Sequence, residues 1–448
     1  MKPNVPEKLY LLAKALPCPL YIVGGAVRDA LAELPAAEDW DLAAPTDADE
    51  VCAAAARAGM TVNAVYRNTG TVNLSDGKRK YEFTSFRTDF YRGGEHAPMR
   101  VRFTDDIEED AKRRDFRCNA VYFDVAAEQF CDPLGGTEDI RARIMRTTRE
   151  AGEVFSEDGL RLMRLARLSA QLGFAPDENC LAGAVENAEK IRKIAAERIF
   201  AELTLLLHAD EKYGRPRAQY EGLKILDETR VLDEILPELA AGRGMRQRSD
   251  FHAHDVLEHS LRACGYADKK VRLSALLHDI GKPYCMRTNG KYHGHDAEGM
   301  RIGRTVLERL KAPKKQAETV VRLIGTHMYD LDGRARESKI RAFIQKNHDI
   351  YPLILLVKQA DYSACKDDLS VCPTLLKWAD IYRKMQSEGV PFSLKELKIG
   401  GNDLADILPP QKRGKVLAAL LAECAYDGRK NDKNYLMAQA ARLAAKEE

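Results

Sequence analysis

Short apolar runs separated by turn residues occupy the first third of the chain. Tyr21–Val23 leads into Gly24-Gly25. Three similar runs follow, each bounded by Asn, Gly or Asp: Thr61–Val65, Thr71–Leu74 and Tyr81–Phe86. Such runs predict short β-strands. Residues 1–20 and the Ala-rich Asp47–Gly59 predict helices, so this part is expected to mix strands and helices.

Most of the chain after residue 148 has the pattern of helices. The segment Ser156–Phe174 places leucine and methionine around most of a helical circumference, which predicts an interior helix beginning near Ser156. Glu189–Leu207 is also expected to be helical. The predicted fold class is therefore α+β: a strand-containing head followed by mostly α-helical domains.

Composition excludes several classes of protein. The chain has 448 residues, 45% hydrophobic and 31% charged, as in ordinary globular proteins. No N-terminal stretch resembles a signal peptide, and no apolar run is long enough to span a membrane. The ten cysteines form no C-x-x-C pair and are expected to be reduced, so a cytoplasmic location is predicted. A net charge of +2 leaves nucleic-acid binding to local patches.

The first candidate site lies between Gly24 and Asp41. Asp39 and Asp41 are two residues apart, so in an extended strand their carboxylates face the same way. Two neighbouring carboxylates repel unless a cation lies between them, and oxygen ligands of this kind suit a divalent metal for phosphoryl or nucleotidyl transfer. Gly24 and Gly25 allow backbone N–H groups to approach a triphosphate, and Arg28 offers it a positive charge.

A second candidate site lies on the predicted interior helix. Its charged residues need partners or a ligand, because isolated buried charges are costly. They are Asp158, Arg161, Arg164 and Arg167. Cytosine and adenine each present an amino donor beside a ring-nitrogen acceptor, whereas uracil and guanine reverse that polarity. A carboxylate only accepts and a guanidinium only donates, so Asp158 and Arg161 together would read C and A and reject U and G.

A third candidate site is a group of histidines and aspartates. Seven of the ten histidines fall between His252 and His327. An adjacent His-Asp pair on a helix, with histidines and an aspartate elsewhere, supplies mixed nitrogen and oxygen ligands for a transition metal. The candidate ligands are His259, His278, Asp279, His295, His327 and Asp361.

Several motifs, in this order, resemble one enzyme family. G-G-A-V-R-D, then D-W-D, then R-R-D-F-R-C-N-A at 113–120 resemble the nucleotidyltransferase head of the polymerase-β superfamily. The match is to the class II tRNA nucleotidyltransferase (CCA-adding enzyme) and bacterial poly(A) polymerase family. In R-R-D-F-R-C-N-A, Arg117 stands where the family usually has threonine. E-D-x-x-R at 157–161 resembles that family's base-reading motif. H-D-I-G-K at 278–282 resembles the HD phosphohydrolase domain.

The resemblance implies a division of the chain and roles for further residues. The implied domains are a catalytic head at 1–148, a helical neck and body at 149–250, an HD domain at 251–370 and a helical tail at 371–448. Glu82 corresponds to a third acidic residue near the metals. Arg114 is implied to contact nucleotide phosphate or ribose, and Arg164 and Arg167 to assist the phosphates or the base pocket. The polar, Gly-rich Asp89–Met99 corresponds to a mobile loop that helps switch between nucleotides.

The function implied is template-independent addition of C, C and A to tRNA 3′ ends from CTP and ATP. Asp39 and Asp41 would hold Mg²⁺, and the HD residues would hold a transition metal: His259, His278, Asp279 and Asp361 at a first site, with His295 and His327 as ligands of a second. Whether the HD domain hydrolyses phosphate esters is left open, as is the oligomeric state.

Four alternatives stay open at this point. A partial enzyme would add only CC or only A, and differences around Asp89–Met99 would decide that. A poly(A) polymerase usually carries a basic R-R-F-x-L-x-H stretch, where this chain has R-N-T-G-T-V-N-L at 67–74. The chain could instead be an HD phosphohydrolase with a nucleotide-binding head, or a non-catalytic RNA-binding module.

Overall fold

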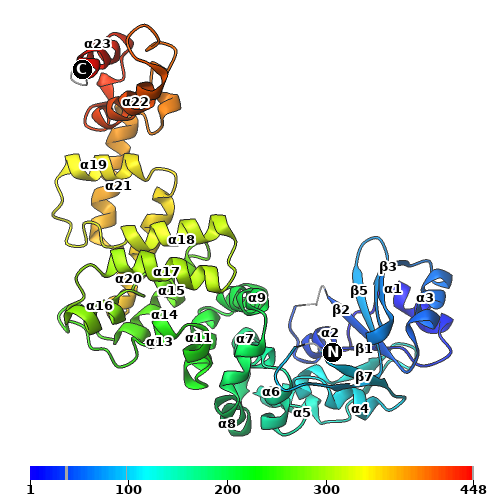
Figure 1. Cartoon of the computed structure of the whole chain (residues 1–448). Helices are drawn as coiled ribbons and strands as arrows, with labels where there is room; N and C mark the ends of the chain where they lie inside the picture. The colour runs from blue at the N-terminus through cyan, green and yellow to red at the C-terminus, as the bar shows by residue number, and fades with distance from the viewer. Residues whose placement is uncertain (36–38, 97, 446–448) are drawn as a thin grey trace. The chain divides into compact units, whose positions relative to one another are not determined.

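The computed structural model describes residues 1–35, 39–96 and 98–445. The chain forms two compact units (Figure 1). The first comprises Met1–Ala241 with Glu308–Ala312, and the second comprises Gly242–Leu307 with Pro313–Glu448. The first unit contains every described strand, and the second is helical, so the predicted α+β class is confirmed.

A seven-stranded mixed sheet forms the head. Its strand order is β3-β4-β5-β2-β1-β8-β9, and β2 and β5 are its parallel neighbours. The strands are β1 (Tyr21–Val23), β2 (Trp40–Ala44), β3 (Thr61–Tyr66), β4 (Thr71–Ser75), β5 (Lys80–Ser85), β8 (Tyr122–Asp124) and β9 (Gln129–Cys131). The predicted strands therefore form, within one or two residues of the expected bounds.

Two small pairings lie outside this sheet. They are the antiparallel hairpin β6 (Arg87–Phe90)–β7 (Arg100–Phe103) and the parallel pair β10 (Ile144–Met145)–β11 (Ala175–Pro176). The hairpin corrects one expectation, because Asp89 was predicted to lie in a loop and lies in β6. Gly94, within the predicted loop, makes an isolated β-bridge to Asp158. Ala97 of that loop is outside the described residues.

Helices complete the first unit. They are α1 (Glu7–Ala15), α2 (Gly25–Leu31), α3 (Ala48–Arg57), α4 (Ile107–Lys112), α5 (Gly136–Ala142), α6 (Ala151–Glu157), α7 (Leu160–Leu172), α8 (Glu178–Glu186), α9 (Ala196–Leu207), α10 (Ala209–Tyr213), α11 (Ala218–Glu228), α12 (Val231–Ile235) and α13 (Pro237–Ala240). Short 3₁₀ helices are η1 (Arg67–Thr69), η2 (Arg117–Asn119) and η3 (Ala188–Lys193). The predicted helix at 189–207 is thus a 3₁₀ turn followed by α9.

The interior helix is present but begins later than predicted. Ser156 lies in α6, and the chain breaks at Asp158, which is extended (φ −139°), before α7 starts at Leu160. Backbone hydrogen bonds to Gly94 explain the break: the Gly94 N–H donates to the Glu157 carbonyl oxygen, and the Gly159 N–H donates to the Gly94 carbonyl oxygen, both at 3.2 Å. Eleven of the thirteen α7 residues are buried, which confirms the interior character inferred from its leucines.

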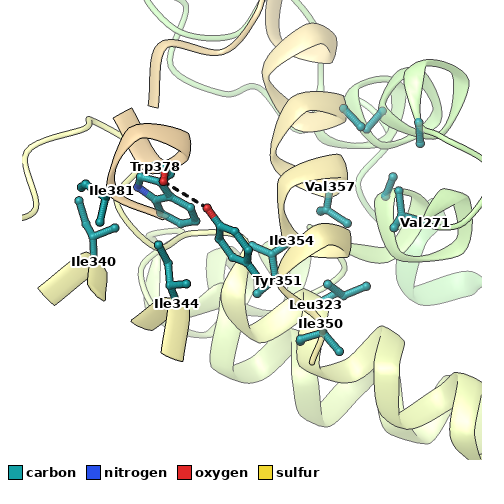
Figure 2. Close-up of a cluster of buried hydrophobic side chains, with 14 of the residues drawn as sticks. Val271, Leu323, Ile340, Ile344, Ile350, Tyr351, Ile354, Val357, Trp378 and Ile381 are labelled. Atoms are coloured by element: carbon teal, nitrogen blue, oxygen red, sulfur yellow. Dashed lines mark hydrogen bonds between the residues drawn. The ribbon is translucent and has the colours of Figure 1, made fainter. Parts of the chain in front are cut away.

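The second unit is a stack of helices with its own core. The helices are α14 (Val256–Tyr266), α15 (Arg272–Leu277), α16 (Lys282–Asn289), α17 (His295–Arg309), α18 (Lys314–Thr326), α19 (Glu337–Lys346), α20 (Tyr351–Lys366), α21 (Pro373–Ser387), η4 (Leu394–Glu396), α22 (Pro410–Cys424), η5 (Gly428–Lys430) and α23 (Lys433–Ala444). Figure 2 shows aliphatic side chains gathered around Tyr351 and the fully buried Trp378.

The last helices enclose a separate, smaller core. It contains Leu397, Leu404, Val416, Leu420 and Leu436. All ten cysteines are free, as predicted. None of the described helices combines the length and the apolar character that a membrane crossing requires.

Candidate functional sites

Three strands bring the predicted acidic residues together. Asp41 on β2 is paired in register with Val23 on β1 and with Glu82 on β5. Asp39 directly precedes β2, and the side chains of Asp39, Asp41 and Glu82 are all exposed. Carboxylates on neighbouring strands can hold a metal that takes further oxygen ligands from a substrate.

The electrostatics of these carboxylates show that they lie near one another and near three arginines. Partial desolvation and the neighbouring charge of Asp41 raise the pKa of Glu82. Desolvation also raises the pKa of Asp41, as does Asp39, while Arg114, Arg164 and Arg28 lower it. Asp41 keeps contact with solvent, so its desolvation comes from the residues packed beside the carboxylate. Acidic and basic groups that face each other in this way fit a metal–phosphate ligand.

Gly24 permits close approach to Asp41. Its φ is +77°, in the left-handed region, and a Cβ there would lie 2.6 Å from Asp41 Oδ2. A side chain at this position would therefore collide with the carboxylate as well as strain the backbone. Gly25 follows as the first residue of α2.

Arg28 is buried rather than presented to solvent. Its guanidinium donates to Asp29 at 2.6 Å, to Asn119 Oδ1 at 2.7 Å and to the Tyr213 hydroxyl at 3.1 Å. Burial lowers the pKa of Arg28, but Asp29 outweighs that effect and the pKa is raised. In this structure Arg28 therefore joins α2, η2 and α10.

The same network continues to α7. Asn119 donates to Asp115 Oδ1 at 3.1 Å, and Arg164 forms an ion pair with Asp115 Oδ2 at 2.7 Å. Burial raises the pKa of Asp115, but Arg164 and the Asn119 hydrogen bond bring it down to about 2. An unbroken chain of charged and amide groups thus links the G-G-A-V-R-D, R-R-D-F-R-C-N-A and α7 segments. We call it the Arg28–Arg164 network.

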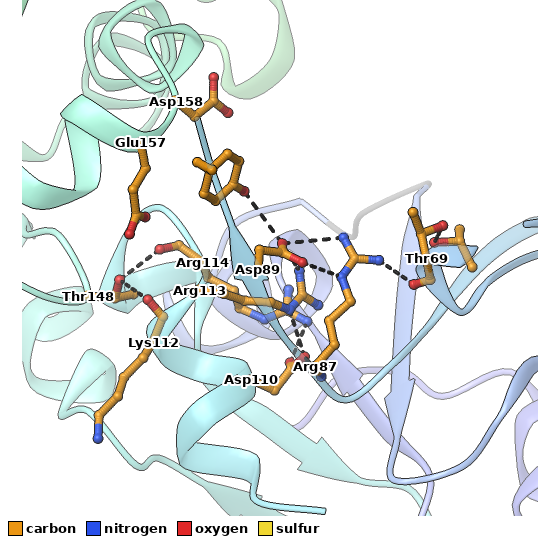
Figure 3. Close-up of polar contacts among 12 residues, drawn as sticks. Thr69, Arg87, Asp89, Asp110, Lys112, Arg113, Arg114, Thr148, Glu157 and Asp158 are labelled. Carbon is orange, nitrogen blue, oxygen red and sulfur yellow. Dashed lines mark hydrogen bonds and ion pairs between the residues drawn. The ribbon is translucent and has the colours of Figure 1, made fainter. Parts of the chain in front are cut away.

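Arg114 belongs to a second group of ion pairs beside the sheet (Figure 3). It donates to Asp110 at 3.2 Å and to the Tyr122 hydroxyl at 3.2 Å. Asp110 also accepts from Arg113, which lies 3.7 Å from Asp89 of the β6–β7 hairpin. Burial lowers the pKa of Arg114, but Tyr122, Asp110 and Asp41 together raise it. Arg114 is therefore a fixed positive charge on the Asp41 pocket.

Arg167 forms its ion pair with Glu202 rather than with the acidic residues of the candidate metal site. Its guanidinium lies 2.6 Å from Glu202 on α9 and donates to Gln171 at 3.0 Å. Burial lowers the pKa of Arg167 more than Glu202 restores it. Glu202 is thus the direct partner of Arg167.

Asp158 is buried and already has two partners. Oδ1 accepts from the Leu160 backbone N–H at 2.9 Å, and Oδ2 lies 2.8 Å from His96 Nδ1. His96 comes from the segment between β6 and β7. The carboxylate predicted to read a base is therefore in contact with the segment predicted to help select nucleotides.

Arg161 is also engaged. It donates to the Val154 and Arg113 carbonyl oxygens at 3.0 and 2.7 Å, and its guanidinium lies over the Tyr91 ring. The break at Gly159 separates Asp158 from α7, so the two residues are not the helix neighbours that the sequence suggested. Asp158 and Arg161 instead both face the β6–β7 hairpin, through His96 and Tyr91.

All six predicted HD ligands converge in the second unit. Five are buried, and Asp361 retains partial exposure. His259 Nε2 lies 3.1 Å from His278 Nε2 and 3.0 Å from Asp361 Oδ1. His295 Nε2 lies 3.2 Å from His327 Nε2 and 3.1 Å from Asp279 Oδ1. Asp279 Oδ2 faces His278 at 3.2 Å, so this carboxylate lies between two groups of ligands.

The other ring nitrogens show why a cation fits there. Nδ1 of His278, His295 and His327 contacts a backbone carbonyl oxygen at 2.7, 2.8 and 2.6 Å, respectively. These contacts place the proton on Nδ1 and leave Nε2 as a lone pair. Two Nε2 lone pairs 3.2 Å apart repel, and a metal ion between them removes that repulsion. These nitrogen and oxygen donors would therefore hold transition-metal ions, with Asp279 among the ligands.

A cavity of about 800 Å³ opens onto this cluster. Its walls include Asp279, His295, His327 and Asp361, together with Lys282 and the aromatic ring of Tyr292. Lys282 Nζ forms an ion pair with Asp279 Oδ2 at 2.6 Å.

Sequence reasoning missed four residues in these sites. Lys282 was visible as the last residue of H-D-I-G-K, and His252, 4.8 Å from His259 between ring centroids, lay in the histidine-rich stretch. His96 could have been noted as the one histidine in the Gly-rich loop. Tyr213, which donates to Asp29 at 2.7 Å, carried no signal, because nothing in the sequence places α10 beside α2.

The Arg28–Arg164 network predicts a pH-dependent stability. With an unfolded-state pKa near 3.9 and a folded value of about 2, Asp115 contributes about 2–3 kcal/mol above pH 5, which is lost as the pH falls from about 5 to 2. Asp115→Asn should therefore destabilise at pH 7, and the gap from wild type should shrink in acid. Urea unfolding of the full chain measures this in a Trp378→Phe background, where fluorescence reports Trp40 of the first unit.

The exposed Asp105 is the matched control. Asp105→Asn should change stability by no more than about 0.5 kcal/mol. A gap between wild type and Asp115→Asn that stays constant down to pH 2 would contradict the proposed charge pairing.

Three family descriptions match successive parts of the chain. The "Poly A polymerase head domain" matches residues 20–146. The "Probable RNA and SrmB- binding site of polymerase A" matches residues 173–242, and the "HD domain" matches residues 252–364. Apart from residue 242, the first two fall in the first unit, and the third falls in the second unit apart from Glu308–Ala312.

Named relatives and a solved structure agree with these matches. A "Multifunctional CCA protein" of Hahella chejuensis is 31% identical over 76% of this chain and 81% of its own length. An "A-adding tRNA nucleotidyltransferase" of Deinococcus radiodurans is 29% identical over 77% of this chain and 76% of its own. The crystal structure of the Bacillus stearothermophilus CCA-adding enzyme in complex with CTP superposes with a TM-score of 0.65, at 25% identity and covering 99% of both chains. The chain therefore belongs to the CCA-adding tRNA nucleotidyltransferase family, with a poly(A) polymerase-type head and an HD domain.

Proposed function

We propose that this chain adds C, C and A to the 3′ ends of tRNA from CTP and ATP, without a nucleic-acid template and with release of pyrophosphate. The observation that carries the proposal is the register of Asp41 with Glu82 on neighbouring strands, together with the positive charges of Arg114 and Arg164 that act on Asp41. Nucleotidyl transfer needs this pairing, because acidic groups bind the metal and basic groups bind the triphosphate.

In this proposal Asp39 and Asp41 hold Mg²⁺, with Glu82 beside them. When bound, Mg²⁺ lowers the pKa of the attacking 3′ hydroxyl and neutralises charge on the departing pyrophosphate. Arg114 and Arg164 orient the triphosphate, and Gly24 and Gly25 let it approach the backbone. Arg28 positions the site rather than contacting the nucleotide, because its hydrogen bonds to Asn119 and Asp29 hold α2 and η2 in place.

The base is read where Asp158 now contacts His96. An incoming cytosine or adenine would replace His96 as the partner of Asp158 and donate a hydrogen bond from its amino group to the Asp158 carboxylate. A guanidinium N–H of Arg161 would donate to the ring nitrogen of the base. Both changes involve the β6–β7 hairpin, which carries Tyr91 and His96. Arg167 supports Arg164 from behind by holding Glu202.

Full CCA addition is preferred over partial addition. The "Multifunctional CCA protein" of Hahella chejuensis is 31% identical over 76% of this chain, and the Bacillus stearothermophilus enzyme crystallised with CTP superposes on 99% of it. The A-adding relative of Deinococcus radiodurans is similar in sequence to the same extent, 29% over 77%, so the tRNA assay below separates the two activities. Ten free cysteines suit a reducing compartment, so we propose that the protein acts in the cytoplasm.

Labelled CTP and ATP with Mg²⁺ test this on tRNAs that lack CCA, CA or only the final A. The wild type should extend all three and refuse UTP and GTP. Asp41→Asn should lower addition by at least about a thousandfold, since it removes several kcal/mol of transition-state stabilisation. Addition only to the tRNA lacking the final A would indicate an A-adding enzyme instead. No incorporation on any tRNA would contradict the proposal.

A second activity, metal-dependent hydrolysis of phosphate esters, is proposed for the second unit. The favouring observation is the set of Nε2 lone pairs that converge on the Asp279 carboxylate at the base of an 800 Å³ cavity. When bound there, a transition metal supplies a hydroxide nucleophile near neutral pH. Lys282 would offer an N–H donor to the phosphate, while Asp279 and Asp361 hold the ligand cluster together.

Hydrolysis of p-nitrophenyl phosphate with added Mn²⁺, Co²⁺ or Ni²⁺ tests this second activity. Asp279→Asn should abolish hydrolysis, because it removes the bridging carboxylate, and should leave tRNA extension within about twofold of wild type. Asp41→Asn should have the reverse effects. Failure of all three metals to support hydrolysis, with tRNA extension intact, would show that the cluster is structural.

A further inference from the structure

His252 and Cys365 lie beside the HD cluster without belonging to the six predicted ligands. His252 precedes α14, which carries His259, and Cys365 is one turn after Asp361 on α20. The Ala253 backbone N–H donates to the Cys365 carbonyl oxygen at 2.8 Å, which fixes the His252 segment against the end of α20. Both side chains line the cavity.

One ligand atom from each of His252, His259 and Cys365 lies within 4.8 Å of the others. The rings of His252 and His259 are nearly perpendicular, with centroids 4.8 Å apart. Two nitrogens and a sulfur at this spacing form the kind of donor set that takes Zn²⁺ or Co²⁺ rather than Mg²⁺.

The hydrogen bonding of His259 leaves one buried ring nitrogen that a bound cation could satisfy. His278, His295 and His327 each use Nδ1 on a backbone carbonyl oxygen. His259 is fully buried, yet its Nδ1 has no hydrogen-bond partner within the described part of the chain, and the same holds for His252 Nδ1. Buried ring nitrogens usually have a partner, because leaving one unpaired costs about 1–3 kcal/mol.

We propose that His252, His259 and Cys365 form a third cation site, distinct from the two ion positions on either side of Asp279. His259 would use Nε2 toward Asp361 and His278, and Nδ1 toward the new site. The thiol of Cys365 and the ring of His259 each release one proton to solvent when the cation binds, which gives a thiolate and a bridging imidazolate. The fourth position of the ion would face the cavity.

Cobalt(II) added to the metal-free full chain tests this inference. We expect a thiolate-to-cobalt charge-transfer absorption in the near ultraviolet, and one more bound equivalent in wild type than in Cys365→Ser by equilibrium dialysis. His252→Gln should also lose that equivalent. Cys372→Ser is the matched control, because Cys372 lines the same cavity outside the trio, and it should keep both the absorption and the stoichiometry.

Three results would overturn the inference. The first is absence of the absorption in wild type, and the second is its persistence in Cys365→Ser. The third is loss of the absorption in Cys365→Ser with no change in the number of bound cobalt ions, which would make Cys365 a ligand of an ion in the six-residue HD cluster. Retained tRNA extension by each variant shows that the chain is folded. Because cobalt binding is measured directly, the outcome does not depend on whether the HD domain hydrolyses phosphate esters.

Discussion

The first unit depends on buried charges that neutralise one another. Arg28, Asp115 and Arg164 would each be costly in the interior alone, and each is stable because the next member of the network satisfies it. The consequence is positional. Segments about 90 and 50 residues apart in sequence (Arg28 to Asn119, and Asp115 to Arg164) are held together by groups that cannot shift without exposing an unpaired charge. Arg164 thereby stays close to Asp41, and the proposed nucleotide pocket is organised before any nucleotide binds.

In the second unit, by contrast, the buried polar groups repel one another. The Nε2 lone pairs of His295 and His327 in its ligand cluster lie 3.2 Å apart. Backbone carbonyl oxygens fix that arrangement from outside, through Nδ1, and the apolar core around Trp378 and Tyr351 supports the same unit. The protein thus supplies rigidity, and a cation would supply the missing attraction. The paired charges of the first unit suit binding of a charged substrate. The imidazole lone pairs of the second unit suit binding of metal ions.

Much of this could be predicted from sequence because the signals are local. Apolar runs bounded by turns predicted β1, β3, β4 and β5, and the leucine pattern predicted α7. The His and Asp positions of the HD cluster were identified from motif spacing, and the structure brings all six together. What could not be predicted depends on contacts between distant segments. The break at Asp158 comes from backbone hydrogen bonds to Gly94, and the contact of His96 with Asp158 comes from the β6–β7 hairpin. The burial of Arg28 comes from Asn119 and Tyr213.

The central claim is that protein side chains, rather than a nucleic-acid template, select the base, with Asp158 as the acceptor. The most direct measurement is kcat/KM for CTP, ATP, UTP and GTP in Asp158→Asn, beside Glu153→Gln as a control on an exposed side chain of α6. We predict that Asp158→Asn lowers kcat/KM for CTP and ATP by about 10–100-fold and narrows their advantage over UTP and GTP, because the amide loses a charged acceptor worth about 1–3 kcal/mol. The control should behave as wild type. Unchanged discrimination in Asp158→Asn would contradict the account.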